Sequence, residues 1–208
     1  ADDAACLIPT LIDAGGILGR IIEYSGADSY VKTLTGCYNY GTLSTTKNFS
    51  ATHQLMLAGI TSRMSSYVTF SNNHNHGEIV HYGNSTTTLY MAGMIGYRNW
   101  SAIDGCTNNK PIHCEGTCNS LHIGGIIGQD VTNAVSNCTN NAEGKLYCSA
   151  NATIKTGVYI GGIAAGGTHE DYPKRATVTS CHNYAEIYSA GTSAAGDVSD
   201  DIRLAGIV

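Results

Sequence analysis

The stretch that decides the fold of this chain is Ile123-Gly124-Gly125-Ile126, followed by Cys138-Thr139-Asn140. Both parts recur along the sequence. The first part is a small residue, a glycine and an aliphatic residue or methionine, and its glycine stands at Gly16, Gly59, Gly93, Gly125, Gly162 and Gly206. The second part, Cys-x-Asn, begins at Cys37, Cys106, Cys138 and Cys181, and a further copy has Asn73 in place of the cysteine. The two parts alternate strictly, which is the pattern of a repeat protein.

The spacing of these parts defines the repeat unit. Successive glycines of the first part lie 43, 34, 32, 37 and 44 residues apart, so the unit has about 32 residues and the outer units carry insertions. Short apolar and β-branched runs between glycine and asparagine favour strands. A single unit cannot bury its apolar side, so the units must stack. We therefore predict an all-β fold, a parallel β-solenoid (β-helix) of about five to six coils.

The prediction treats residues 1–208 as a single β-solenoid domain, in which 1–11 lead in and 12–208 form the repeats. Insertions at 20–35, 44–55 and 166–200 are expected to form loops that carry binding. The last coil is incomplete. Three explanations are open. The sequence is a fragment of a longer array, the ordered structure ends at that point, or the next subunit of a filament completes the coil.

Stacking places equivalent residues about 4.8 Å apart. We predict a structural ladder in which each side-chain amide bonds the next one, formed by Asn39, Asn75, Asn108, Asn140 and Asn183. The cysteines beside it are expected to pack inside as small apolar groups. Ile123 and Ile126 are three residues apart and cannot share one face of a regular strand, so the glycine pair is predicted to form a corner that turns both inward.

The alternation of Gly-Gly-Ile-x-Gly with Cys-x-Asn resembles the GLUG-type repeats of bacterial cell-surface proteins. The copies at 123–128 and 138–141 are the most similar, and the resemblance covers roughly residues 12–207. It implies a parallel β-solenoid on a secreted or surface-anchored protein, often with an adhesive role. The second copy lacks the cysteine and the fourth inserts Glu143-Gly144, so the coil boundaries depart from the family pattern there.

Composition excludes several other classes of protein. The net charge is -5, which does not suit a nucleic-acid binder, and 42% hydrophobic residues exceed what a disordered chain carries. No apolar run is long enough for a membrane span. Eight cysteines and a start at Ala1 without Met favour an extracellular or cell-surface location. The alternative is a reduced protein with cysteines buried in its core.

Cysteine spacing suggests one disulfide. Cys114 and Cys148 occupy equivalent places in neighbouring units, and we consider a bond between them alongside an unbonded pair. His113, Cys114, Cys118 and His122 are potential zinc ligands, but no second cysteine pair completes the site, so the sequence does not favour zinc binding. We predict no metal and no cofactor.

The residues beside the inward Cys and Asn positions should point outward. They form a candidate binding stripe for glycans or another chain, made of Tyr38, Tyr40, His74, His76, His182 and Tyr184. The alternative is an ordinary solvated sheet face. Candidate glycosylation sites are the sequons at Asn48, Asn84, Asn99, Asn137 and Asn151.

No phosphate-binding loop, nucleophile elbow or zinc-protease motif occurs in the sequence. We therefore predict a non-catalytic secreted or cell-surface structural and adhesive repeat protein, with self-association through its ends as a filament subunit. It is not expected to be an enzyme. The alternatives are a glycan-binding module that uses the stripe, or a polysaccharide-degrading enzyme with acidic and basic side chains in a groove.

Overall fold

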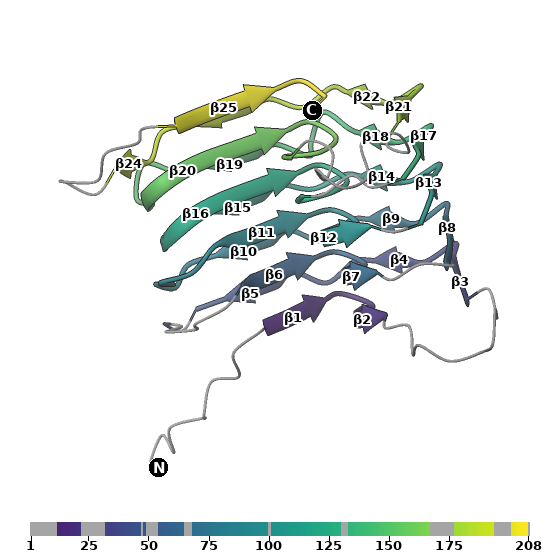
Figure 1. The fold of residues 1–208 in the computed structure, drawn as a ribbon, viewed down its shortest axis with the longest axis horizontal. Helices are drawn as coiled ribbons and strands as arrows, with labels where there is room; N and C mark the ends of the chain where they lie inside the picture. The colour runs from purple at the N-terminus through teal and green to yellow at the C-terminus, as the bar shows by residue number, and fades with distance from the viewer. Residues whose placement is uncertain are drawn as a thin grey trace, which may run out of the picture.

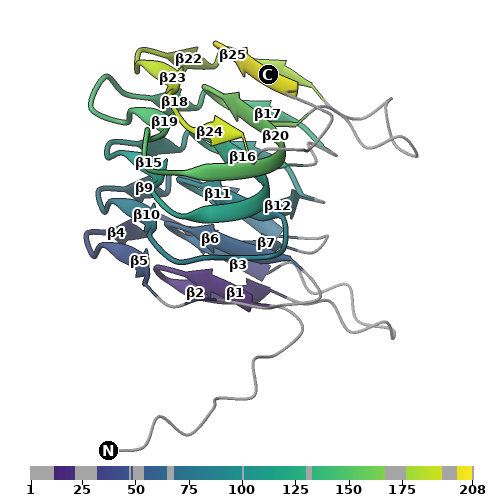
Figure 2. The same cartoon turned by 90° about the vertical axis from the view of Figure 1, so that its left-hand side faces the viewer.

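The structure is a computed structural model, and it describes residues 12–21, 32–46, 48, 54–64, 68–99, 101–129, 133–166, 177–193 and 201–207. Every regular element in these ranges is a β-strand, and the strands pair in parallel between successive coils. The coils stack along one axis (Figures 1 and 2). The predicted all-β parallel β-solenoid is confirmed.

Each coil passes through up to five sheets in turn. The seven-stranded sheet contains β1 (Ile12–Gly15), β6 (Leu55–Ala58), β11 (Leu89–Ala92), β16 (Thr117–Gly124), β20 (Thr153–Gly161), β24 (Thr192–Ser193) and β25 (Asp201–Ala205). The three-stranded sheet contains β2 (Leu18–Ile21), β7 (Thr61–Met64) and β12 (Ile95–Asn99).

The other three sheets have five strands each. The β3 sheet contains β3 (Lys32–Thr35), β8 (Val68–Ser71), β13 (Ile103–Asp104), β17 (Val135–Ser136) and β21 (Val178–Thr179). The β4 sheet contains β4 (Tyr38–Asn39), β9 (His74–Asn75), β14 (Thr107–Asn108), β18 (Thr139–Asn140) and β22 (His182–Asn183). The β5 sheet contains β5 (Leu43–Thr45), β10 (Ile79–His81), β15 (Ile112–Cys114), β19 (Leu146–Cys148) and β23 (Ile187–Ser189).

The predicted number of coils needs correction. Among the described residues, only three coils have a strand in all five sheets, because the β2–β7–β12 sheet has three strands there. In the next two coils a single bridge residue, Ile127 or Ala164, stands in place of that strand. The following residues, Gly128 and the pair Ala165–Gly166, are poor strand formers. The estimate of five to six therefore exceeds the number of complete turns.

A left-handed backbone corner precedes the β4 sheet in every coil. The residues at this corner have φ between 52° and 64°, and they are Gly36, Asn72, Gly105, Asn137 and Ser180. Each stands directly before the cysteine position of its unit. Glycine and asparagine tolerate this region better than most residues, so the corner explains their presence there.

The glycine pair forms the predicted corner at the end of the seven-stranded sheet. Ile123 and Ile126 are both fully buried, and they belong to different hydrophobic clusters. One cluster lies between the seven-stranded and β5 sheets, and the other is formed around Phe70 and the cysteines at 106 and 138. The turn at the glycine pair therefore lets one short segment contribute to both halves of the core.

The Asn ladder runs between these two clusters. Each amide nitrogen donates to the Oδ1 of the next asparagine at 2.8 Å, from Asn39 to Asn75, Asn108, Asn140 and Asn183. The same nitrogens also donate to a backbone carbonyl two or four residues further on. The five side chains are aligned in register, so the predicted ladder is present.

Two departures from the repeat are absorbed locally. Asn73, which replaces the cysteine, accepts a hydrogen bond from the Cys37 amide and donates one to the Leu34 carbonyl. The inserted Glu143-Gly144 forms a turn, and Asn140 donates to the Gly144 carbonyl there. Leu146 stays paired with Ile112, so the insertion does not shift the register of the next strand.

Candidate functional sites

The aromatic stripe lies on the outer face of the β4 sheet as predicted. Tyr38, Tyr40 and Tyr184 are 50%, 72% and 64% exposed. The rings stack on one another across the coils: Tyr38 on His74 with centroids 4.7 Å apart, and Tyr40 on His76 at 5.0 Å. Each of these contacts covers one face of the tyrosine ring, and the rings remain largely exposed.

The middle of the stripe is polar and hydrogen-bonded. His74 Nδ1 lies 2.7 Å from the Thr107 hydroxyl, and Asn141 donates to the Asn109 side chain. The pKa of His74 is lowered by its partial burial and by the neighbouring His76. His182 and Tyr184 form a separate stacked pair in the last coil, with centroids 5.9 Å apart. The outer face of the β4 sheet therefore carries aromatic rings in its first two coils and in its last one, with amide and hydroxyl side chains between them.

The proposed disulfide is not formed. Cys114 and Cys148 are paired in register on neighbouring strands, and both are free, buried thiols. The spacing of about 4.8 Å between adjacent strands falls within the roughly 4.4–6.8 Å that disulfides allow between Cα atoms, so the register would permit the bond although the sulfurs are not joined. The two cysteines are nevertheless neighbours, as their equivalent places in the repeat predict. Together with Cys118 they form a cluster of cysteines.

The second cysteine column packs inside, as expected. Cys106 and Cys138 are fully buried, and Cys37 and Cys181 at the column ends are half-buried. Each thiol donates to the carbonyl oxygen two residues before it, as Cys138 does to Ser136 at 3.1 Å. A hydrogen bond with Cys106, together with burial, raises the pKa of Cys138 to about 12. The Cys138 thiol is therefore protonated at neutral pH.

The residues weighed as zinc ligands do not converge. The Cys114 side chain is in the core, while His113 points outward and binds two carboxylates. Within the described segments, no group of three or more His, Cys, Asp or Glu side chains is arranged around a metal position.

An ionic network around His113 was missed in the sequence. Its Nε2 lies 2.9 Å from Glu78 and its Nδ1 lies 3.0 Å from Glu115, and the ring stacks on Tyr147. Burial would raise the pKa of Glu115, but hydrogen bonds from Ser149 and Asn151 and the charge of His113 lower it. Every member of the network has a hydrogen-bond or ion-pair partner, so the network connects neighbouring coils and serves a structural role.

The sequons lie in different surroundings. Asn48, Asn84, Asn137 and Asn151 are exposed. Asn137 stands at the left-handed corner and donates to Asp104, and Asn151 donates to Glu115. Asn99 is the last residue of β12, and its side chain lies outside the described part. Most of the three predicted insertions also lies outside the described residues.

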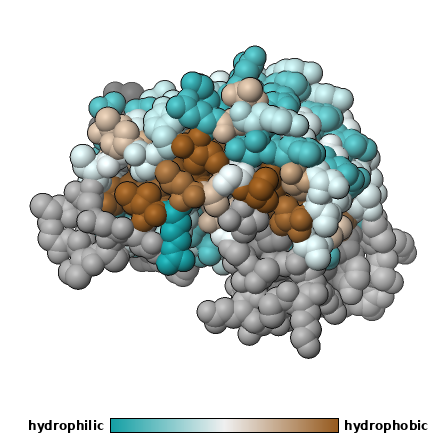
Figure 3. Space-filling view, turned by 90° about the horizontal axis from the view of Figure 1, so that it is seen from above, coloured by the Kyte–Doolittle hydropathy of each residue, from teal (hydrophilic) through white to brown (hydrophobic). Residues whose placement is uncertain are grey.

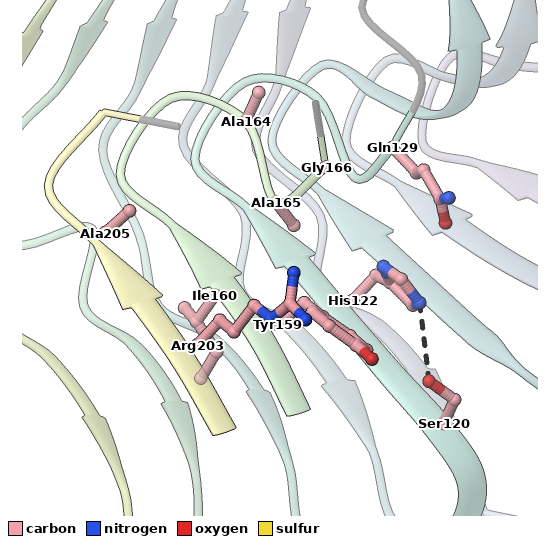
Figure 4. Close-up of a pocket in the computed structure, with 10 residues that line it drawn as sticks. All are labelled: Ser120, His122, Gln129, Tyr159, Ile160, Ala164, Ala165, Gly166, Arg203 and Ala205. Carbon is pink, nitrogen blue, oxygen red and sulfur yellow. Dashed lines mark hydrogen bonds between the residues drawn. The ribbon is translucent and has the colours of Figure 1, made fainter. Parts of the chain in front are cut away.

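A pocket of about 600 Å³ opens on the outer face of β16, β20 and β25 (Figure 4). Its lining consists of Ser120, His122, Gln129, Tyr159, Ile160, Ala164, Ala165, Gly166, Arg203 and Ala205. At the corresponding face of β6 and β11, Met56 and Tyr90 are covered by Tyr97 of β12. The pocket therefore lies where the three-stranded sheet has ended.

The pocket floor is a column of side chains from neighbouring strands. His122 stacks on Tyr90 on one side and on Tyr159 on the other, at 4.9 and 4.6 Å between centroids. The Arg203 guanidinium lies over the Tyr159 ring, 5.7 Å from its centroid. A Cβ at residue 157 would lie 2.9 Å from the Tyr159 ring, so Gly157 makes room for that ring.

His122 and Gln129 each carry a polar atom without a hydrogen-bond partner. These atoms are His122 Nδ1 and Gln129 Oε1, and both are enclosed. The other ring nitrogen of His122 lies 3.3 Å from the Ser120 hydroxyl, which donates its own proton to the Gly157 carbonyl. His122 Nε2 therefore carries the hydrogen, and Nδ1 is an acceptor. Desolvation lowers the pKa of His122 to about 4, so the ring is neutral at pH 7.

Core side chains are exposed at the end of the solenoid that carries β25. Ile202 and Leu204 of β25 are 54% and 46% exposed, whereas their partners in β20, Val158 and Ile160, are 5% and 1% exposed. Viewed from above, this end shows hydrophobic surface near its centre (Figure 3). The edge of β25 is thus both apolar and open among the described residues.

Comparisons with protein-family models, with curated proteins and with solved structures found no match to this chain. None of the described segments forms a membrane-spanning helix.

Proposed function

We propose that this chain is a non-catalytic structural and adhesive repeat module, secreted or displayed on a cell surface, which associates with itself through the end that carries β25. The resemblance to GLUG-type repeats is part of this proposal. The observation that carries it is the uninterrupted Asn ladder, because a continuous ladder along the axis produces a stiff body with extended side faces.

The stiffness argument rests on how the ladder is enclosed. Four amide-to-amide bonds of 2.8 Å tie five coils together. Asn75, Asn108 and Asn140 are fully buried, where an amide hydrogen bond is stronger than in water and an unpaired amide is costly. Sliding one coil relative to the next would break the amide-to-amide bond between them together with the in-register strand pairing beside it. The module is therefore suited to bear load or to hold surface groups at fixed distances.

Self-association is supported by the exposed core at β25. Ile202, Leu204 and Ile207 continue apolar columns that are buried in the preceding coil. An open strand edge with apolar side chains favours pairing with another chain. A second copy of this chain offers a suitable surface at its first coil, where Ile17 and Leu18 are 38% and 41% exposed. Such a contact between different ends is the kind that generates filaments.

An extracellular address is compatible with the free cysteines. Thiol oxidation and exchange proceed through the thiolate. Burial raises the pKa of Cys148 to about 12, and the hydrogen bond with Cys106 does the same for Cys138. These thiols would therefore stay reduced in an oxidising compartment.

Glycan binding by the stripe and an enzymatic role receive less support from the geometry. Stacking on His74 and His76 covers one face each of Tyr38 and Tyr40, which reduces the surface left for a sugar. Among the described residues that line the pocket there is one basic side chain, Arg203, and no carboxylate. The acid–base pair of a polysaccharide-degrading enzyme is not assembled by those residues.

The proposal is tested by sedimentation velocity and negative-stain microscopy of the chain over a range of concentrations. We expect end-to-end particles that grow with concentration. Leu204→Lys, which places a charge on the exposed core column, should give monomers. Tyr82→Lys changes a residue that is 53% exposed on the side of the solenoid and should leave assembly unchanged. A wild-type chain that stays monomeric throughout would contradict self-association.

A further inference from the structure

We propose that the pocket formed by Ser120, His122, Gln129, Tyr159, Ala165 and Arg203 binds an uncharged, hydroxyl-rich ligand, such as a monosaccharide or the terminal residue of a glycan. This binding site goes beyond the structural role proposed above and does not depend on it. It lies on the seven-stranded sheet, away from the aromatic stripe on the β4 sheet.

The size and shape of the pocket suit a small ligand. Its volume of about 600 Å³ falls within the range of small-molecule sites, roughly 300–1,000 Å³. One wall is apolar and contains Ala164 and Ala165, and the floor is the edge of the Tyr159 ring (Figure 4). Polar groups from β16 and from the segment after it meet the apolar wall. A sugar ring likewise combines C–H surface with hydroxyl groups.

The unpartnered atoms define what the ligand must offer. His122 Nδ1 and Gln129 Oε1 are both acceptors, and both lack a donor. An enclosed polar atom without a partner costs about 1–3 kcal/mol, so a ligand that supplies donors gains stability there. Ser120 donates its hydroxyl proton to the Gly157 carbonyl, so its oxygen accepts from His122 Nε2. His122 Nδ1 then carries no hydrogen and is an acceptor.

The charges of the lining discriminate between donor-bearing ligands. Hydroxyl and ammonium groups both donate hydrogen bonds. The described lining contains no carboxylate to balance an ammonium ion, and the Arg203 guanidinium beside Tyr159 would repel one. The lowered pKa of His122 keeps its ring neutral at pH 7. An anion would be attracted by Arg203, but it would place acceptor oxygens against the acceptor atoms His122 Nδ1 and Gln129 Oε1 and leave both without a donor. Hydroxyl donors fit these conditions best.

The test is an NMR titration of the ¹⁵N-labelled chain with D-glucose, D-galactose, D-mannose and N-acetyl-D-glucosamine, with glutamate and spermidine as charged probes. We expect at least one sugar to give saturable shifts at the amides of 120–122, 129, 159, 164–166 and 203–205. Gln129→Leu removes an acceptor and should weaken binding about tenfold. Ala165→Leu fills the pocket and should abolish binding.

Two control variants separate pocket binding from other causes. Gln54→Leu makes the same change as Gln129→Leu outside the pocket, and His76→Phe alters the aromatic stripe; both should bind as the wild type does. The spectra of all four variants report whether each is folded before its affinity is compared. The proposal is overturned if no sugar shifts the pocket amides, if only glutamate or spermidine does so, or if the shifts map to the aromatic stripe.

Discussion

Gly125 and Asn140 are in direct contact across the interior of the solenoid, between its two hydrophobic clusters. A Cβ added at Gly125 would lie 2.8 Å from both Cβ and Cγ of Asn140, and closer still to the Gly162 carbonyl oxygen. The same contact joins Gly16 to Asn39, Gly59 to Asn75, Gly93 to Asn108 and Gly162 to Asn183. Each coil is therefore narrow between its two core clusters, where a glycine on one side contacts the Asn ladder on the other.

Gly125→Ala should destabilise the fold by about 3 kcal/mol, because the methyl group has no space against Asn140 and the backbone. Gly206→Ala is the matched control, since it holds the same place in the last unit and no atom lies within 4 Å of its Cβ position. Chemical denaturation measures both. Equal effects of the two substitutions would show that the contact is not what requires glycine.

Asn108→Ala should cost about 3 kcal/mol in unfolding free energy. It removes the acceptor for Asn75, the donor for Asn140 and the donor to the Lys110 carbonyl, so each of these groups loses one hydrogen bond in or beside the buried ladder. Asn84→Ala, at an exposed position, should change the free energy by no more than about 0.5 kcal/mol. A loss at Asn108 no greater than this would argue against the ladder as a stabilising element.

Ser180→Gly should stabilise the protein by about 1 kcal/mol. Ser180 has a φ of 52°, a region that costs a residue with a Cβ about 1–2 kcal/mol and costs glycine little. Gly36 and Gly105 already occupy this corner in other coils. Ser180→Ala keeps the strain and serves as the control in the same melting experiment. A glycine variant no more stable than the alanine variant would contradict the assigned corner.

The neutral His122 should make stability depend on pH. Desolvation lowers its pKa from 6.5 to about 4 in the folded state. Between these values the unfolded chain binds a proton that the folded chain does not, so stability falls as the pH decreases from 6.5 to 4 and levels off below that. The loss from this group is at most about 3 kcal/mol. His122→Phe should remove this part of the slope, and His182→Phe, at an exposed position, should leave it unchanged.

The buried cysteines should react slowly in the folded protein and fully after unfolding. Cys106, Cys114, Cys118, Cys138 and Cys148 are buried and free. Iodoacetamide at pH 8 should leave these five unmodified in the native state and label them in guanidinium chloride without reductant. Mass spectrometry of the peptides reads out each site. A Cys114–Cys148 peptide pair in the unreduced sample would show that the bond exists after all.

The sequence was sufficient for the features that repeat. Because like residues recur in the same order, stacking them in register follows from the repeat alone, and the alignment of Asn39 with Asn183 through three intermediates needs no other information. The parity of Ile123 and Ile126 likewise indicated a corner. The left-handed residue before each cysteine position was visible in the alternation of glycine and asparagine, but the signal was overlooked.

The features that do not repeat were decided by the tertiary structure. The three-stranded sheet ends after β12 in the described part of the chain, where Ile127 and Ala164 make only single bridges, and no ring like that of Tyr97 covers His122 and Tyr159 at the pocket. Glu78 comes from the coil before that of His113 and Glu115, so the register of the coils brings it to His113. A repeat specifies which residues lie above one another. The lengths of the side chains and the path of the connecting segments determine which residues at non-equivalent positions come into contact.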